Sequence, residues 1–317
     1  MRVLVTGGAG FIGSNFVEMA LTDQFPAISS VLVLDKLTYA GKLSNLSGVA
    51  DNPNFDFIQG DICNVELVNK LAANSDAIIN FAAESHVDRS IEDSSEFIRT
   101  NVLGTQVLLD AAKKHKVDKF VQVSTDEVYG SILEGSWDEN EPLLPNSPYS
   151  ASKAAADLLA RSYFVTHGLN VSITRCSNNF GPRQDPEKLI PNFIHKLSHG
   201  KKVSVYGDGL NVRDWLFVND HCQGIYLTLT KGLAGEIYNI GGGTELTNLE
   251  LTRILIEIFQ KDEGFIDYVP DRLGHDRRYS VNCSKIEKLG YVPSEYFERN
   301  LVTTVSWYQE ILNAKTK

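Results

Sequence analysis

Short apolar segments alternate with longer amphipathic segments through the first half of the chain. Six runs rich in β-branched and aromatic residues have the length and composition of strands, at residues 3–5, 31–34, 55–58, 77–81, 120–123 and 171–174. Helical periodicity lies between most of them, including residues 13–21, 101–115 and 149–167. Strands that alternate with helices predict a parallel sheet covered on both faces. The expected fold class is therefore α/β, with a doubly wound, Rossmann-type parallel sheet.

The alternation weakens after about Asn178, where a glycine and three prolines cluster. Beyond them we expect a strand at 203–206 and helices at 220–229 and 248–259. These elements predict a smaller C-terminal substrate-binding region that closes over the sheet edge. The expected division is one domain at residues 1–178 and 213–243 and a second at 179–212 and 244–317. Ligands of doubly wound folds bind at the carboxyl ends of the strands, where the two domains would meet.

Composition and net charge limit the classes of binding partner that we expect. The 317 residues carry a formal net charge of -10, so no broad attraction to nucleic acid or to an anionic membrane is expected. No apolar run approaches the roughly 18 residues of a membrane span, and a first strand directly after Met1-Arg2 predicts that there is no signal peptide. The four cysteines are far apart and the histidines lack metal-ligand spacing, which predicts no metal site and reduced thiols in a cytoplasmic protein.

A glycine-rich loop follows the first strand and opens the first helix. Gly7, Gly10 and Gly13 allow a tight turn and a close approach of the backbone to a pyrophosphate, which the N–H groups of the helix start would hold. Asp35 ends the second strand, where it would bind both ribose hydroxyls of an adenosine and repel a 2′-phosphate. A glycine turn or a strand-end acid alone is weak evidence, but the strand–loop–helix context predicts that the first domain binds NAD.

A tyrosine and a lysine lie one helical turn apart after a helix-start signal at Pro148. Tyr149 and Lys153 would face the same side of that helix. The lysine would lower the pKa of the phenol and hold cofactor ribose, so that the tyrosinate takes a proton from a sugar hydroxyl. This spacing is common in packed helices, but its place after an NAD loop and after Ser124-Thr125 favours a catalytic pair.

Six further blocks carry a family resemblance that runs nearly the whole chain: residues 82–90 (AAESHVDRS), 124–130 (STDEVYG), 186–191 (PEKLIP), 206–209 (YGDG), 213–215 (RDW) and 274–279 (GHDRRY). With the NAD loop and the Tyr–Lys pair, they resemble the extended short-chain dehydrogenase/reductases, and among these the family of dTDP-glucose 4,6-dehydratases. The resemblance implies a homodimer and a hydro-lyase that converts a nucleoside diphosphate-glucose, expected to be dTDP-glucose, into the 4-keto-6-deoxy sugar.

The resemblance also implies the catalytic roles. Tyr149, supported by Lys153, would take the C4 hydroxyl proton while Thr125 hydrogen-bonds the C4 oxygen. Glu127 would remove the C5 proton and Asp126 would protonate the departing C6 hydroxyl. In epimerases of the same superfamily the corresponding pair is small or apolar, so two adjacent carboxyls indicate elimination. The alternative for such a pair is a solvated loop or a structural salt bridge.

The remaining site residues are carried over by position. The cofactor contacts implied are Gly7, Gly10, Phe11, Ile12, Gly13, Asp35, Lys36, Thr38, Asp61, Ile62, Ala82, Ala83, Thr100, Tyr149, Lys153 and Asn179. The contacts implied to the sugar nucleotide are Ser85, Thr125, Asn178, Lys188, Leu189, Tyr206, Arg213, Asn248 and His275. A guanidinium such as that of Arg213 suits a pyrophosphate, although a surface salt bridge is its ordinary role.

The chain departs from the family pattern at Arg183 and Asp185, where aromatic or histidine residues are usual. Two other functions stay open at this point. One is a nucleotide-sugar 4-epimerase or uronate decarboxylase on the same fold, and the other is an NAD-binding protein without catalysis. The Asp126–Glu127 pair argues against the first, and the complete set of acid/base residues argues against the second.

Overall fold

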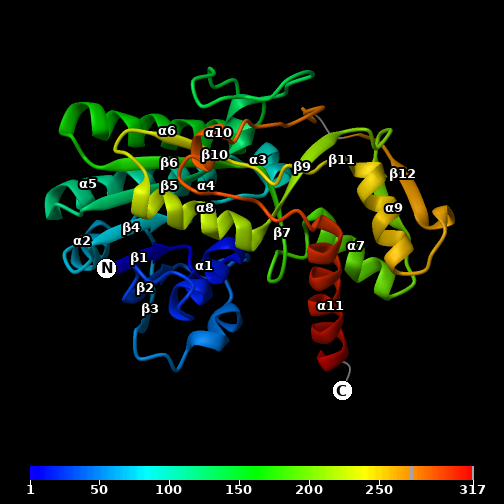
Figure 1. The fold of residues 1–317 in the computed structure, drawn as a ribbon, viewed down its shortest axis with the longest axis horizontal. Helices are drawn as coiled ribbons and strands as arrows, with labels where there is room; N and C mark the ends of the chain where they lie inside the picture. Colours follow the sequence, from blue (N-terminus) through cyan, green and yellow to red (C-terminus); the bar gives the residue numbers. More distant parts are fainter. Residues whose placement is uncertain (272–273, 316–317) are drawn as a thin grey trace.

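A seven-stranded sheet, all of whose pairs are parallel, forms the centre of the molecule (Figure 1), in the order β10-β6-β5-β4-β1-β2-β3. The computed structural model describes residues 1–271 and 274–315. The sheet consists of β1 (Arg2–Thr6), β2 (Ser30–Asp35), β3 (Phe55–Gln59), β4 (Ala77–Asn80), β5 (Lys119–Thr125), β6 (Val171–Cys176) and β10 (Ile237–Ile240). The doubly wound fold and its six predicted strands are confirmed.

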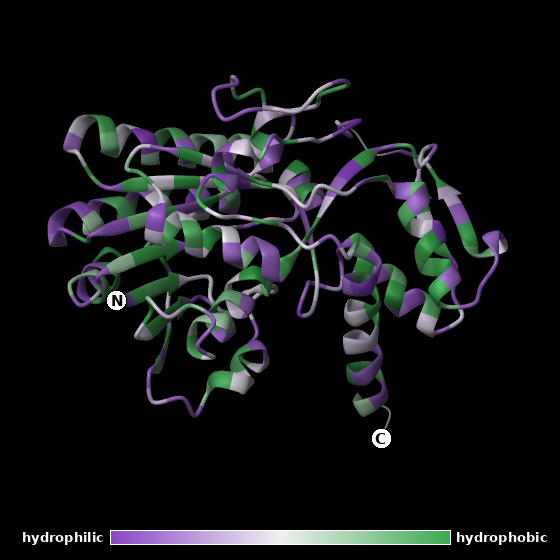
Figure 2. Ribbon diagram, in the orientation of Figure 1, coloured by the Kyte–Doolittle hydropathy of each residue, from purple (hydrophilic) through white to green (hydrophobic). Residues whose placement is uncertain are grey.

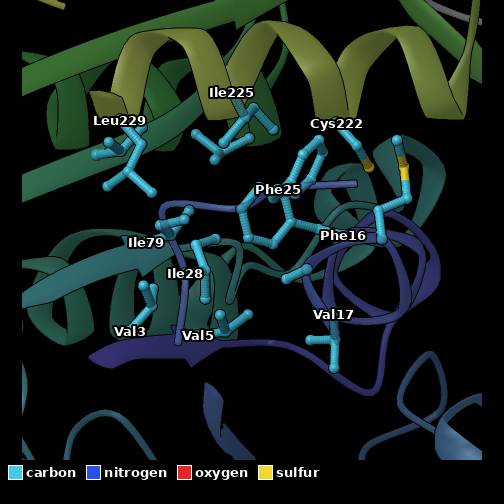
Figure 3. Close-up of a cluster of buried hydrophobic side chains, with 14 of the residues drawn as sticks. Val3, Val5, Phe16, Val17, Phe25, Ile28, Ile79, Cys222, Ile225 and Leu229 are labelled. Atoms are coloured by element: carbon cyan, nitrogen blue, oxygen red, sulfur yellow. The ribbon is translucent and has the colours of Figure 1, made fainter. Parts of the chain in front are cut away.

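Helices cover both faces of this sheet. α1 (Phe11–Leu21) and α8 (Val218–Lys231) cover one face, and α2 (Val65–Ala72), α5 (Thr105–His115) and α6 (Pro148–His167) cover the other. Successive strand residues point to opposite faces, so Val3 and Val5 join the first core while Leu4 joins the second. Figure 3 shows the first core, where these two valines lie below Ile225 and Leu229 of α8. Burial on both faces explains why the strands read as continuous apolar runs.

Local sequence signals set the ends of α6. Ser147 caps the helix and forms a capping box with Ser150, Pro148 occupies the first turn, and Gly168 ends the helix with φ +66°. The helix predicted over 101–115 is α5 preceded by a π-helical segment, η2 (Ile98–Gly104). The remaining short helices of the first half are η1 (Leu43–Val49), α3 (Val87–Glu92), α4 (Ser95–Phe97) and η3 (Asp126–Tyr129).

A smaller region lies beside the carboxyl ends of the strands, at the right of Figure 1. β7 (Asn178–Phe180), β9 (Val212–Phe217) and β11 (Glu245–Thr247) form one sheet, and β8 (Val203–Tyr206) pairs with β12 (Ile266–Val269). The helices here are α7 (Leu189–Ser198), α9 (Asn248–Ile258), η4 (Glu263–Phe265) and α11 (Phe297–Lys315). They enclose a third core that includes Phe193, Leu251 and Leu301. Figure 2 shows bands of both polarities along these helices, as helices with one buried face require.

The chain returns to the first core near its C-terminal end. α10 (Ser284–Glu287) packs on β10 and α8, and Ile286 and Tyr291 are buried in the first core. The Tyr291 hydroxyl donates a hydrogen bond of 2.8 Å to the carbonyl of Gly241. A stretch of the second predicted domain therefore packs on the first. None of the helices in the described parts of the chain has the length and apolarity to cross a membrane.

Candidate active site

A cavity of about 290 Å³ lies at the carboxyl ends of the central strands, where the smaller region meets the sheet. Every residue that the sequence predicts to contact the cofactor lines this cavity. The predicted catalytic residues Thr125, Asp126 and Glu127 line it as well, together with Ser85, Asn178 and Lys188. The sequence alone assigned no cofactor or substrate contact to the following lining residues: Leu34, Ala40, Gly41, Gly60, Phe81, Glu84, Val123, Ser124, Cys176, Ser177, Gln184 and Asp185.

The glycine loop leaves room for an anion at the start of α1. Gly7 has φ +70°, and a Cβ on it would lie 2.6 Å from the backbone nitrogen of Ala82. A Cβ on Gly13 would collide with the carbonyl oxygen of Gly7. The helix begins at Gly10 without a side-chain cap and without an acidic residue in its first turn. The first N–H groups of α1 are therefore suited to hold a pyrophosphate.

Asp35 is held in place by backbone donors. Its Oδ2 accepts a hydrogen bond of 2.9 Å from Ala9 N–H, and its Oδ1 accepts one of 2.8 Å from Leu37 N–H. Burial raises the pKa of this carboxyl despite both bonds. Each oxygen keeps a second lone pair, so the carboxylate fits the two ribose hydroxyls of an adenosine. Lys36 forms an ion pair of 3.1 Å with Asp61 across the same end of the cavity.

The Tyr149 hydroxyl is a weaker acid than the sequence predicted. Burial, and then the charge of Glu127, raise the pKa of Tyr149 well above its usual value, while a hydrogen bond with Thr125 acts in the opposite direction. Lys153 is buried too, which lowers its pKa, and its Nζ donates a hydrogen bond of 2.7 Å to the carbonyl of Val123. The expectation of a lowered pKa at Tyr149 is wrong, because desolvation by burial dominates and raises it.

Asp126 and Glu127 differ in their surroundings. Both follow β5 in the short helix η3, which Thr125 caps by accepting a hydrogen bond of 3.3 Å from Glu127 N–H. Asp126 is buried and Glu127 is half-buried. Burial, Glu127 and Asp214 raise the pKa of Asp126 well above its usual value, and Arg213 only partly offsets this effect. A raised pKa is the direction that a general acid requires.

Four of the predicted substrate residues lie together outside the cavity lining. Tyr206 and His275 meet edge to face with ring centroids 6.4 Å apart. The Arg213 guanidinium is buried, stacks 4.3 Å from the centroid of Tyr279, and donates to the carbonyl of Asp276. Its neighbours are Asn211, whose amide donates to the same carbonyl, and Asn248, whose N–H donates to Asn211. Leu189 begins α7 and packs on the third core.

The two departures from the family pattern have separate surroundings. Arg183, with φ +71°, forms an ion pair with Glu18 of α1 and donates a hydrogen bond of 3.1 Å to Asn15. Asp185 lines the cavity and accepts a hydrogen bond from Glu187 N–H. Arg183 therefore ties the loop after β7 to the helix that follows the glycine loop.

A dinucleotide cradle joined to a buried Tyr–Lys pair at the strand ends defines an extended short-chain dehydrogenase/reductase. Residues 4–304 match the family model described as GDP-mannose 4,6 dehydratase, and the chain belongs to that family. A dTDP-glucose 4,6-dehydratase from Streptomyces niveus is 55% identical over 313 residues, which cover 98% of this chain and 93% of the relative.

Solved structures agree with this family. The structure of DesIV, a dTDP-glucose 4,6-dehydratase from Streptomyces venezuelae with NAD and TYD bound, is 54% identical with a TM-score of 0.97, covering 99% of this chain and 98% of DesIV. A UDP-glucose 4-epimerase from Thermotoga maritima with UDP-glucose has a TM-score of 0.90 over 98% of this chain and 100% of its own, at 31% identity. The epimerases therefore share the fold at lower sequence identity.

Proposed function

We propose that this protein is an NAD-dependent hydro-lyase that removes water from dTDP-glucose to give the 4-keto-6-deoxy sugar nucleotide. The observation that carries this proposal is the pair Asp126–Glu127, which lines the same cavity as Tyr149 and Lys153. An epimerase or a decarboxylase has no step that needs two such carboxyls. Identities of 55% and 56% to dTDP-glucose 4,6-dehydratases over 98% of the chain support the same substrate.

The residues fit NAD at one end of the cavity. The cradle at Gly7 and Gly13 has no room for a Cβ, the start of α1 offers N–H groups, and Asp35 has lone pairs for ribose hydroxyls. A buried carboxyl at this place disfavours the 2′-phosphate of NADP. When bound, NAD would accept a hydride from C4 of the sugar and return it at C6. We propose residues 1–178 and 213–243 as the NAD-binding domain and residues 179–212 and 244–317 as the sugar-nucleotide domain.

Four side chains would handle the protons. Tyr149 takes the proton of the C4 hydroxyl, and Thr125, which hydrogen-bonds Tyr149, orients that oxygen. Glu127 removes the C5 proton, which the neighbouring ketone makes acidic, and returns it to C5 when the hydride adds at C6. Asp126, whose pKa is raised by burial, supplies the proton with which the C6 hydroxyl leaves as water. The two carboxyls thus differ in burial, and unlike surroundings suit one to the acid and the other to the base of a single elimination.

The sugar nucleotide would extend from the cavity toward the smaller region. Arg213 is close enough to Asp126 to influence its pKa, and Tyr206, Asn248 and His275 lie beyond it. A guanidinium binds two phosphate oxygens at once, so we assign Arg213 to the pyrophosphate. Ser85, Asn178, Lys188 and Leu189 complete the proposed substrate contacts.

The test is a panel of TDP-, UDP-, CDP- and GDP-glucose with product mass measured for each. We expect loss of one water, with TDP-glucose fastest. An unchanged mass with inversion at C4 would instead identify an epimerase. No turnover of these four sugars would leave a uronate decarboxylase or an NAD-binding protein without catalysis, and release of carbon dioxide from UDP-glucuronate tells these two apart. Relative rates identify the nucleotide.

We also propose a homodimer built from α5 and α6, which lie side by side on one face of the sheet (Figure 1). Leu158 and Val165 of α6 are 58% and 61% exposed, and Leu103 before α5 is 48% exposed. Leu159 and Tyr163 are partly buried and pack against the second core. Light scattering at micromolar concentration should give a dimer, which Leu158→Glu dissociates and the loop variant Leu133→Glu does not.

We propose a cytoplasmic location for this protein. Its four cysteines are all free, as expected in a reducing compartment.

A further inference from the structure

A buried histidine outside the cavity forms a hydrogen bond with a residue of the cavity lining. His221 of α8 is fully buried, and its Nδ1 lies 2.9 Å from Oδ1 of Asn179 in β7. Asn179 lines the cavity, whereas His221 does not. Any effect of His221 on a ligand in the cavity therefore passes through the Asn179 amide.

The surroundings of Asn179 fix the direction of this hydrogen bond. Asn179 Nδ2 lies 3.0 Å from the carbonyl oxygen of Ser177, which can only accept, and 3.4 Å from Sγ of Cys176. The amide nitrogen must therefore face Ser177, and the amide oxygen must face His221. Since that oxygen only accepts, Nδ1 of His221 carries a proton and donates it.

The opposite side of the imidazole explains why it stays neutral. Nε2 of His221 is buried and has no hydrogen-bond partner in the described part of the chain. A second proton there would be a buried charge without an acceptor. Burial accordingly lowers the pKa of His221 to about 3. The ring is thus a neutral donor through Nδ1 at physiological pH.

The Asn179 amide has one acceptor position left. Both N–H bonds of its amide point to Ser177 and Cys176, and one lone pair of Oδ1 is taken by His221. The second lone pair of Oδ1 remains, so Asn179 can offer the cavity an acceptor. A ligand group that binds it must donate.

This acceptor lies at the reactive end of the cavity. Cys176, which contacts Asn179, is close enough to Tyr149 and Lys153 to affect the pKa of both. The glycine loop and Asp35 hold the adenosine and pyrophosphate elsewhere in the cavity. The part of NAD that reacts is the nicotinamide, and its carboxamide NH₂ is a donor of the required kind.

We propose that His221 is a positioning residue that holds the Asn179 amide with Oδ1 ready to accept a hydrogen bond from the nicotinamide carboxamide. This inference rests on the proposed NAD dependence. It assigns no proton transfer to His221. The histidine acts by preventing rotation of the Asn179 amide. A rotated amide would place its N–H groups opposite the carboxamide NH₂ of nicotinamide, which is itself a donor.

The test compares NAD with its 3-acetylpyridine analogue, in which a methyl group replaces the carboxamide NH₂. After removal of bound dinucleotide, dissociation constants are measured by calorimetry for four proteins. The wild type should prefer NAD, and His221→Leu should lower that preference about three- to ten-fold, as expected for one neutral hydrogen bond. His221→Asn should keep it, because the asparagine Nδ2 occupies the place of the histidine Nδ1.

Thr228→Val is the matched control. It removes a buried hydrogen bond to Gly224 within the same helix, without contact to Asn179, and should leave the preference unchanged. An unaltered preference in His221→Leu, or a loss in His221→Asn or in Thr228→Val as large as that in His221→Leu, would overturn the role of His221. A wild type that binds neither dinucleotide would instead overturn the proposed cofactor and this inference with it.

A second measurement needs no variant to fold. The ¹⁵N resonances of His221 in the wild type should show a protonated Nδ1 and a bare Nε2, both without and with NAD. A proton on Nε2 alone would contradict the assigned hydrogen bond.

Discussion

Thr125 donates a hydrogen bond of 3.4 Å from Oγ1 to Oδ1 of Asp126, while Oδ2 of the same carboxyl is buried without a partner among the described residues. A carboxyl supported on one side only is poorly stabilised as an anion. This asymmetry favours the neutral form of Asp126, as the proposed role of general acid requires. Glu127, one residue further, has more contact with solvent and suits the base.

Asp126→Asn and Glu127→Gln should separate oxidation from loss of water. Neither amide exchanges a proton with the sugar, so elimination should slow by about 10²–10⁴-fold. Oxidation at C4 depends on Tyr149 and should persist at a reduced rate. Absorbance of the reduced cofactor should therefore build up in single-turnover mixing, whereas the wild type shows little. Loss of stability and NAD in both variants would indicate a structural pair, and water loss at the normal rate would refute the acid/base assignment.

Tyr149→Phe should abolish the first step while the fold is kept. Only a hydroxyl is removed, and the expected loss in the rate of hydride transfer is about 10²–10⁴-fold. Stopped-flow absorbance with quenched product analysis measures it. Tyr268→Phe, at a 56% exposed position in β12, is the control and should behave like the wild type. A fully active Tyr149→Phe enzyme would remove this residue from the mechanism.

Gly13→Ala should weaken NAD binding. Its methyl group would collide with the carbonyl of Gly7 and force the loop away from the anion. Loss of a charge-assisted hydrogen bond implies about ten-fold lower affinity or more. Fluorescence titration with NAD provides the measurement. Gly48→Ala is the matched control, because a Cβ there meets nothing closer than 3.8 Å. Equal affinities in both variants would contradict the proposed cradle.

His221 should make the protein sensitive to acid. Its pKa is about 3 in the folded chain and 6.5 in the unfolded one, so the unfolded state binds the extra proton between these values. The free energy of unfolding should therefore fall as pH falls below 6.5, by about 2 kcal/mol at pH 5. Buried carboxyls with raised pKa, such as Asp126, act in the opposite direction. The difference between wild type and His221→Asn in urea unfolding at pH 7.5 and 5 isolates the histidine. A pH-independent difference would contradict this prediction.

Much of the fold could be predicted from local signals in the sequence. Capping at Ser147, the glycine turn and the apolar strand runs each act over a few residues, and they predicted the main elements. β10 was missed because it joins the sheet only through pairing with β6, which lies about 60 residues earlier in the chain. The π-helical turn before α5 has the same apolar periodicity as an α-helix. It was therefore read as part of one helix.

The site shows the same division between local and distant effects. The NAD loop and the Tyr–Lys pair are contiguous, so spacing revealed them. His221 reaches Asn179 through the packing of α8 on β7, and no spacing rule connects the two residues. The pKa of Tyr149 depends on burial, which a sequence does not display. Arg213 was open to a surface salt bridge, whereas it lies buried against Tyr279.

The return of the chain at α10 bears on how the protein is made. Ile286 and Tyr291 complete a core whose first members are Val3 and Val5, so that core cannot close on the ribosome until nearly the whole chain has been synthesised. Earlier nascent chains already carry the glycine loop and the strands around it. Such intermediates expose unpaired apolar surface for most of translation. Completion of the core beneath the glycine loop therefore depends on residues that are synthesised more than 200 positions after that loop.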